Sequence, residues 1–256
     1  MRPARASGPQ FEASKIKIQR AEKHIAELDS AMQGFFSKKP FRAIVEPGET
    51  VARQVITFRV RKVVPKEFSA IIGDVIHNLR TALDLLASEL VRLNKQSDED
   101  VYFPFCDKAD YLDTMIRKRH LDRAAPQCVE LIRTLKPYTN GNVALRAIHD
   151  LDIQDKHKML ILASGSAGFG NAKFGDGKAH ISVGAGVKFV VIDGFTLFTF
   201  PADPKLRIGQ EIKTTFTLIF PPLGPLGARE VLPTLRSLAK LVSGIVESFE
   251  ALGVSE

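Results

Sequence analysis

The sequence has few of the features that mark secreted, membrane or disulfide-linked proteins. No apolar run in its 256 residues approaches the roughly 20 residues that a membrane-spanning helix needs. The opening MRPARASGPQ has no apolar stretch of the kind found in a secretory leader, and we expect residues 1–10 to be a disordered tail. There are only two cysteines, Cys106 and Cys128, and neither belongs to a C-x-x-C pair. These absences favour a cytoplasmic location in a reducing compartment of the bacterial type.

The motifs of several common enzyme classes are also absent. There is no G-x-x-x-x-G-K-[ST] phosphate-binding loop, no H-E-x-x-H or paired-cysteine zinc pattern, and no G-x-S-x-G nucleophile turn. The glycine-rich residues 164–177 follow a predicted strand, but they do not open a helix as a phosphate-binding loop must. We therefore interpret them as a connection between strands, and we expect no cofactor.

Positive charge is concentrated at the N-terminal end. Residues 1–62 contain 13 Lys and Arg against 6 Asp and Glu, whereas residues 63–256 contain 23 of each. A localised basic surface attracts phosphate backbones by releasing their counterions, so this segment is a candidate nucleic-acid contact. The alternative is a solvated helix followed by a hairpin whose Lys and Arg protect an exposed sheet edge. Few aromatic residues interleave with these charges, which weakens the first interpretation.

Apolar periodicity and turn residues predict the order of helices and strands. Helices are expected at residues 11–33, 66–93, 107–119, 125–135, 142–153 and 228–252. Two β-rich runs flank Pro47-Gly48 and predict a hairpin. The residues after Lys158 are rich in β-branched and aromatic side chains, and Asp193-Gly194 is the strongest hairpin signal among them.

This order predicts an α+β fold. We expect a helical core whose long central helix packs on an antiparallel sheet, with the last helix closing the structure. The sheet would be built from the N-terminal hairpin and a C-terminal meander. No internal repeat or long linker divides the chain, so we expect a single α+β domain over residues 11–256.

The long helix carries the most informative set of polar side chains. At about 100° per residue one narrow stripe contains Asp74, His77, Thr81 and Asp84, with Arg80 on its flank. An imidazole can move protons near neutral pH, carboxylates can orient it, and a guanidinium can hold a phosphate. The opposite face is apolar, however, and a polar stripe opposite an apolar one is also typical of an ordinary surface helix.

A second polar cluster, HDLDIQDKHKML, occupies residues 149–160. The apolar residues around it have the spacing of the buried side of a helix that should end near Asp155. The Lys and His residues that follow suit a helix C-terminus, because they meet the negative end of the helix dipole. A carboxylate is unfavourable there unless it has a partner, and His77 or Arg80 of the long helix would supply one.

The order of these motifs resembles a family of uncharacterised bacterial and phage proteins. The landmarks are G-D-x-x-H-N-L-R-x-A-L-D-x-L from Gly73 to Leu86, F-P-F from Phe103 to Phe105, L-K-P-Y from Leu135 to Tyr138, and D-K-H-K from Asp155 to Lys158. The resemblance spans nearly the whole chain and implies that eight polar residues are family features, namely Asp74, His77, Asn78, Arg80, Asp84, Asp155, Lys156 and His157. It implies the place of a site but no reaction.

A remoter similarity is to HEPN-type helical proteins, many of which are metal-independent ribonucleases or nucleotide-binding modules. The helix with His, Asn and Arg and the basic segment fit this likeness. The hallmark of those proteins is an Arg followed by a His with four to six residues between them, and this sequence has no such pair. An active site of that type would need its Arg and His from different helices.

Our first hypothesis is a nucleic-acid-associated protein that acts as a metal-independent, ribonuclease-like phosphodiesterase. Two histidines and nearby cations suffice for metal-free RNA cleavage, because the 2′-hydroxyl is the internal nucleophile. The residues expected to be catalytic are His77, His157, Arg80 and Asp155. Those expected to bind substrate are Lys156 and Asn78, and those expected to orient the others are Asp74 and Asp84.

The alternative is a binding or structural protein that is not an enzyme. In it, the same His, Asp and Arg side chains form a buried polar network that pins the long helix to the helices after it. Removing one partner from such a network costs about 1–3 kcal/mol. A third hypothesis is a divalent-metal site made of Asp74, His77, Asp155 and His157. The sequence leaves the substrate open, and a homo-oligomer is compatible with it.

Overall fold

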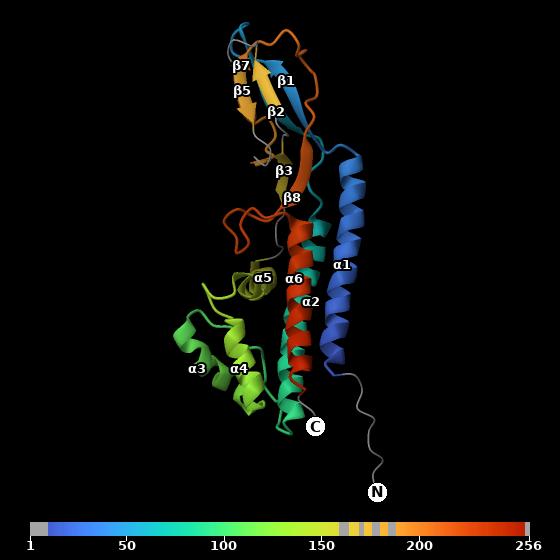
Figure 1. Cartoon of the computed structure of the whole chain (residues 1–256). Helices are drawn as coiled ribbons and strands as arrows, with labels where there is room; N and C mark the ends of the chain where they lie inside the picture. The colour runs from blue at the N-terminus through green and yellow to red at the C-terminus, as the bar shows by residue number, and fades with distance from the viewer. Residues whose placement is uncertain (1–9, 159–163, 169–171, 176–179, 184–187, 254–256) are drawn as a thin grey trace. The chain divides into compact units, whose positions relative to one another are not determined.

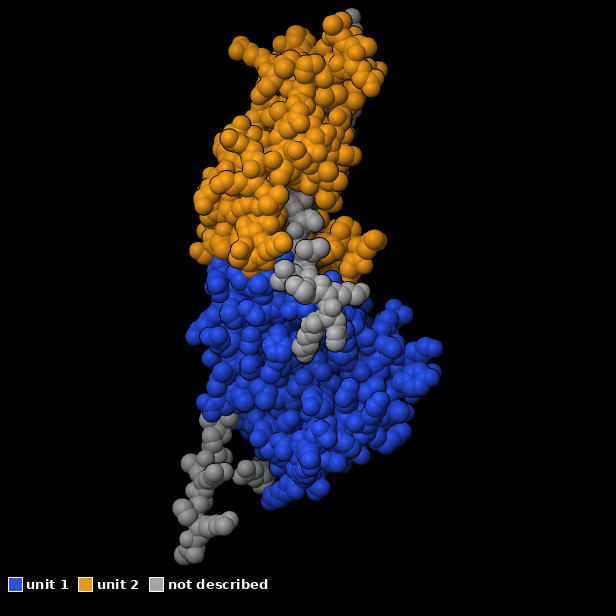
Figure 2. Space-filling model, turned by 180° about the vertical axis from the view of Figure 1, so that it is seen from behind, with its two compact units in different colours: residues 1–28, 69–161, 232–256 blue, residues 29–68, 162–231 orange. Residues whose placement is uncertain are grey.

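The chain divides into two compact units (Figure 2). Unit 1 comprises residues 1–28, 69–161 and 232–256, and unit 2 comprises residues 29–68 and 162–231. The computed structural model describes residues 10–158, 164–168, 172–175, 180–183 and 188–253. Each unit combines segments that are distant in the sequence. The single domain expected from the sequence stays a prediction.

Unit 1 is built from helices (Figure 1). The α-helices of the described residues are α1 (Glu12–Ser37), α2 (Lys66–Leu93), α3 (Leu112–Lys118), α4 (Pro126–Leu135), α5 (Val143–Lys158) and α6 (Val231–Ala251). The helix predicted over residues 66–93 is confirmed as α2. Residues 107–119 instead contain a 3-10 turn, Ala109–Tyr111, before α3 begins. α5 continues to Lys158, beyond its predicted end at residue 153.

The apolar face of α2 contributes to the core of unit 1. Completely buried side chains of α2 include Ile72, Val75, Leu79, Leu83, Leu86 and Leu90. Ser14 of α1 donates its hydroxyl to the Ala82 carbonyl at 3.0 Å, and the N–H of Phe11, directly before α1, donates to the Glu89 carboxylate at 2.8 Å. These two contacts fasten α1 to α2, because each satisfies a polar group in buried or partly buried surroundings.

Unit 2 holds the strands, which pair antiparallel in three small sheets. The first sheet has the order β1 (Phe41–Pro47), β2 (Arg53–Val60), β7 (Thr196–Pro201). The second has the order β6 (Lys188–Val190), β3 (Ser164–Gly168), β8 (Thr215–Ile219), and the third pairs β4 (Ala172–Gly175) with β5 (His180–Val183). The hairpin predicted around Pro47-Gly48 is confirmed, with Ala43 opposite Phe58. As expected, this N-terminal hairpin joins a strand from late in the chain.

The prediction of a hairpin at Asp193-Gly194 is wrong, because the strands before and after it do not pair with each other. A turn does form there, since Gly194 has a φ of 70° and the Phe195 N–H donates to the Ile192 carbonyl at 3.2 Å. However, β6 before the turn pairs with β3, whereas β7 after it pairs with β2. The turn itself is bound to β2, because the Gly194 N–H donates to the Phe58 carbonyl at 2.9 Å. Pairing with the earlier hairpin therefore replaces pairing between the two neighbouring strands.

The α+β fold class is confirmed. The described residues form a helical part with a long helix at its centre, antiparallel sheets that include the N-terminal hairpin, and a final helix. The late strands contribute to three sheets rather than to one meander. In the part of the chain that the structure describes, no helix combines the length and the apolar character needed to cross a membrane.

The burial of α2 predicts a large effect of core truncation. Replacing Leu79 with Ala should lower the free energy of unfolding by about 2–5 kcal/mol, because a completely buried side chain leaves a cavity. Urea denaturation followed by circular dichroism measures the change. Leu252→Ala removes a leucine that is 38% exposed, and it should change the stability by only about 0.5 kcal/mol. Equal losses in the two variants would contradict the packing described.

Candidate functional site

Three segments of unit 1 meet along the polar stripe of α2. They are α2 itself, the extended residues 101–107, and α5. We call the set of polar and aromatic side chains at this meeting the α2–α5 cluster, and its members are His77, Arg80, Asp84, Phe105, Arg146, His149, Asp152 and Asp155. The extended segment reaches the cluster because both Phe103 and Phe105 are buried on either side of Pro104.

His77 and Asp152 form an imidazole–carboxylate pair between α2 and α5. Nδ1 of His77 lies 3.0 Å from Oδ1 of Asp152. Asp152 is only 5% exposed, whereas half of the His77 side chain, 52%, is exposed. An ionised carboxylate can only accept hydrogen bonds, so this pairing assigns the proton to Nδ1 and leaves Nε2 as the basic nitrogen. This is the arrangement in which a buried acid orients a histidine for proton transfer.

Arg80 holds the extended segment against α2. Its guanidinium pairs with Asp84 one helical turn later and lies 4.8 Å from the centre of the Phe105 ring. Asp84 also accepts a hydrogen bond from the Phe103 N–H at 2.9 Å. Only 12% of the Arg80 side chain is exposed. These contacts anchor the fold, and a phosphate-holding role for Arg80 stays a prediction.

His149 forms an aromatic wall of the cluster. Its ring stacks on Phe105 with 4.7 Å between the ring centres and an angle of 4°. Among the described residues, its buried Nδ1 has no hydrogen-bond partner. Burial, with the positive charges of Arg80 and Arg146 nearby, lowers the pKa of His149 to about 4. The ring is therefore neutral at pH 7.

Arg146 fastens α5 to the extended segment. Its guanidinium donates to the Cys106 carbonyl, pairs with Asp107 at 3.0 Å and pairs with Asp150 at 2.9 Å. Only 14% of its side chain is exposed. Three acceptors on two segments occupy this guanidinium, so Arg146 is an anchor of the same kind as Arg80.

Gly73 allows the end of α5 to approach α2. A Cβ added at Gly73 would lie 2.6 and 2.7 Å from the two carboxylate oxygens of Asp155. Any side chain at this position would therefore force the carboxylate to move. The carboxylate therefore lies against α2 one turn before His77, and its pairing with His77 or Arg80 stays a prediction.

The other predicted site residues have simpler surroundings. Asn78 donates its side-chain amide to the Asp74 carbonyl at 2.8 Å, which is a contact within α2. The Asp74 side chain is exposed. The backbone of Lys156 and His157 belongs to the last turn of α5, but their side chains lie outside the described part of the structure. The roles assigned to these four residues stay predictions.

Sequence reasoning missed Asp152, which is the residue that contacts His77. A signal for it was present. Leu145, Ile148 and Asp152 have the i, i+3, i+7 spacing of one helix face, so the sequence puts a carboxylate on the apolar side of α5. A buried carboxylate needs a partner, and that requirement predicts a polar side chain on a neighbouring element.

A metal site is a separate question. Within the described residues, no group of three or more His, Cys, Asp or Glu side chains is placed to hold a metal ion. The hypothesis of a site with His157 involves a side chain outside that part of the chain.

Burial raises the pKa of the Cys106 and Cys128 thiols, so neither has the character of an activated nucleophile.

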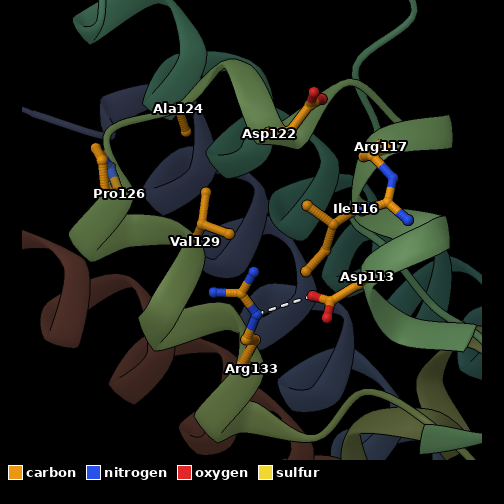
Figure 3. Close-up of a pocket in the computed structure, with 8 residues that line it drawn as sticks. All are labelled: Asp113, Ile116, Arg117, Asp122, Ala124, Pro126, Val129 and Arg133. Atoms are coloured by element: carbon orange, nitrogen blue, oxygen red, sulfur yellow. Dashed lines mark hydrogen bonds and ion pairs between the residues drawn. The ribbon is translucent and has the colours of Figure 1, made fainter. Parts of the chain in front are cut away.

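Unit 1 also has a pocket of about 330 Å³ among α3, α4 and the turn between them (Figure 3). Among its lining residues, Arg133 donates to Asp113 at 2.8 Å. The lining consists of four charged and four apolar residues, namely Asp113, Arg117, Asp122 and Arg133, and Ile116, Ala124, Pro126 and Val129. None of the residues of the α2–α5 cluster lines it.

No protein-family model, no curated protein and no solved structure matches the chain. The two family resemblances stay predictions.

The low pKa of His149 predicts a specific loss of stability in acid. Because the pKa is about 4 in the folded protein and 6.5 as the ordinary value, the unfolded chain binds a proton more readily. The contribution of the neutral His149 ring to the free energy of unfolding is fully present above pH 6.5, and it is lost as the pH falls from 6.5 towards 4. His149→Phe keeps an aromatic ring against Phe105 and should make the fall of the melting temperature over this range shallower. Parallel curves for the two proteins would contradict the prediction.

The contact between Gly73 and Asp155 predicts a coupling. In the Asp155→Ala background, Gly73→Ala should stabilise the protein by up to about 1 kcal/mol, because Ala is the better helix former. With Asp155 present the gain should disappear or reverse, because the new Cβ meets the carboxylate. Chemical denaturation of the four proteins measures the coupling. Gly244→Ala in α6, where nothing lies within 4 Å of the added Cβ, should give the same gain in both backgrounds.

Proposed function

We propose that the protein acts on nucleic-acid phosphodiesters by proton transfer at His77. One observation carries the proposal: the half-exposed imidazole of His77 is paired with the nearly buried carboxylate of Asp152. A surface histidine without a role has no need of a buried acid from another helix. Withdrawing that acid from water is costly unless its partner compensates for it.

The chemistry follows from the imidazole tautomer that a carboxylate partner favours. Asp152 holds the proton on Nδ1, so Nε2 can accept a proton from an attacking hydroxyl. The same carboxylate then stabilises the imidazolium that forms. In RNA the attacking group is the 2′-hydroxyl of the substrate itself, so the reaction needs only an oriented base, an acid for the leaving oxygen and positive charge near the phosphate.

The remaining roles are assigned to the end of α5. In the proposal His157 is the acid for the leaving oxygen and Lys156 meets the phosphate. Both follow Asp152 by four or five residues in the same helix, and their backbone lies in its last turn. Association with nucleic acid is supported by the basic residues 1–62.

A second candidate function is purely structural, and a different set of contacts favours it. Arg80 and Arg146 are mostly buried, and both tie residues 101–107 to a helix. In that case the α2–α5 cluster is a polar clamp that joins α2 to α5, and the His77 pair is its outermost member.

Cleavage of a labelled RNA by purified wild-type and variant proteins tests the proposal. His77→Ala should lower the cleavage rate by about 100- to 10,000-fold, which is the usual contribution of an acid–base group. Asp152→Asn should also lower the rate, because a neutral amide neither fixes the tautomer nor stabilises the imidazolium. The melting temperatures report whether the variants fold.

The matched control is His24→Ala. His24 lies on α1 and also pairs with a carboxylate, that of Glu27 at 3.2 Å, but it is outside the α2–α5 cluster. It should retain full activity. Cleavage that survives His77→Ala would refute the proposed function. If the wild type cleaves nothing and His77→Ala lowers only the melting temperature, the structural candidate is the correct one.

A further inference from the structure

We propose that one end of the β1–β2 hairpin in unit 2 is a binding surface for single-stranded nucleic acid. The surface consists of Lys38, Lys39, Arg61, Lys62 and Phe195, and we call it the hairpin-end surface. The inference rests on the nucleic-acid association in the proposed function, but it does not depend on the chemistry of His77.

Four basic side chains gather at this end because two chain segments meet there. The N–H groups of Arg61 and Lys62 both donate to the Pro40 carbonyl, at 2.7 and 3.3 Å. Lys38 and Lys39 directly precede that proline, and all four cationic side chains are exposed. In the part of the chain that the structure describes, none of the four forms an ion pair. Their charge is therefore available to a partner from outside.

The acids near the hairpin offset this charge only in part. Asp193 accepts a hydrogen bond from the Val60 N–H at 2.8 Å, and Glu46 pairs with Arg59. Glu67 lies in the first turn of α2, directly after Lys66, which is also exposed. The cations of the hairpin-end surface thus outnumber the acids around them.

The tertiary structure adds an exposed aromatic side chain, because the five phenylalanines of residues 1–62 are buried or half-buried. Phe195 is 49% exposed, and its carbonyl accepts a hydrogen bond from the Phe58 N–H at 3.1 Å. The Gly194 N–H donates to the carbonyl of the same Phe58, so two backbone hydrogen bonds join the turn to this residue of β2. Phe195 therefore lies next to Phe58 of β2, three residues before Arg61. In the sequence Phe195 and Arg61 are more than 130 positions apart.

An exposed aromatic side chain and unpaired cations at the same end of the β1–β2 hairpin fit a single strand better than a duplex. The cations meet the phosphates, and the ring stacks on a base. In a duplex the base faces are covered by their neighbours, so the ring would have nothing to stack on. Stacking tolerates every base, so we expect little sequence preference. Val190 and Ile192, which precede Phe195 in the sequence, are also exposed, at 38% and 55%.

Fluorescence anisotropy with a labelled oligouridine of about 12 nucleotides tests the inference with the full-length protein. Phe195→Ala should weaken binding by roughly 5- to 100-fold, and Phe195→Tyr should restore it, because tyrosine also stacks. The matched control is Tyr111→Ala, which removes an aromatic side chain that is 56% exposed in unit 1. It should leave the affinity unchanged.

The salt dependence of oligonucleotide binding tests whether the cationic side chains contact phosphates. The double variant Arg61→Ala, Lys62→Ala should reduce the slope of log affinity against log salt by about 1.4, since each lost phosphate contact removes about 0.7. The double variant Arg117→Ala, Lys118→Ala removes the same two residue types, also adjacent and exposed, from unit 1. It should keep the wild-type slope.

Several outcomes would overturn the inference. They are equal effects of Phe195→Ala and Tyr111→Ala, duplex RNA bound as tightly as the single strand, or binding to phosphatidylserine vesicles without binding to the oligonucleotide. The result is also separable from the proposed function. Wild-type binding that depends on Phe195, without any cleavage, would refute only the proposed chemistry. Cleavage that is unaffected by loss of the hairpin-end surface would refute only the inference.

Discussion

The close approach of α5 to α2 is the contact on which the candidate site depends. It is possible because Gly73 has no side chain, so the Asp155 carboxylate can lie where a Cβ would otherwise be. With the end of α5 in that position, Asp152 one turn earlier reaches His77, and His149 one turn earlier again reaches the extended segment. These three residues of α5 are spaced three positions apart, so they lie on one helix face. That face contacts both α2 and the extended residues 101–107.

The polar stripe that looked uniform in the sequence divides into two parts with different chemistry. Arg80 is enclosed by Asp84 and an aromatic ring, so its charge stabilises the fold around it. His77, three residues earlier, keeps half of its side chain in water and has a buried acid behind it. A fold anchor and a candidate proton-transfer group thus lie on adjacent turns of one helix. This explains why the sequence alone supported both a structural and a catalytic interpretation.

Positive charge and aromatic surface are supplied to the hairpin end by different parts of the chain. The basic residues belong to the N-terminal hairpin, whereas Phe195 follows the turn before β7. The interpretation as a nucleic-acid contact was weak at the sequence level, because few aromatic residues interleave with the charges of the first 62 positions. The turn at residues 194–195 is hydrogen-bonded to β2, and it brings the exposed Phe195 to the basic hairpin from a distant part of the chain.

The sequence by itself determined the helices, the first hairpin and the α+β class, because each follows from local periodicity and turn residues. It also located the two polar segments, since Asp155 at a helix end needed a partner. Only the tertiary structure decided that Asp152 faces His77, that Asp193-Gly194 joins strands of different sheets, and that Phe195 meets the basic hairpin. Periodicity shows which face of an element is buried, but it holds no information about the element that lies opposite. That choice depends on packing and hydrogen bonding between residues far apart in the chain.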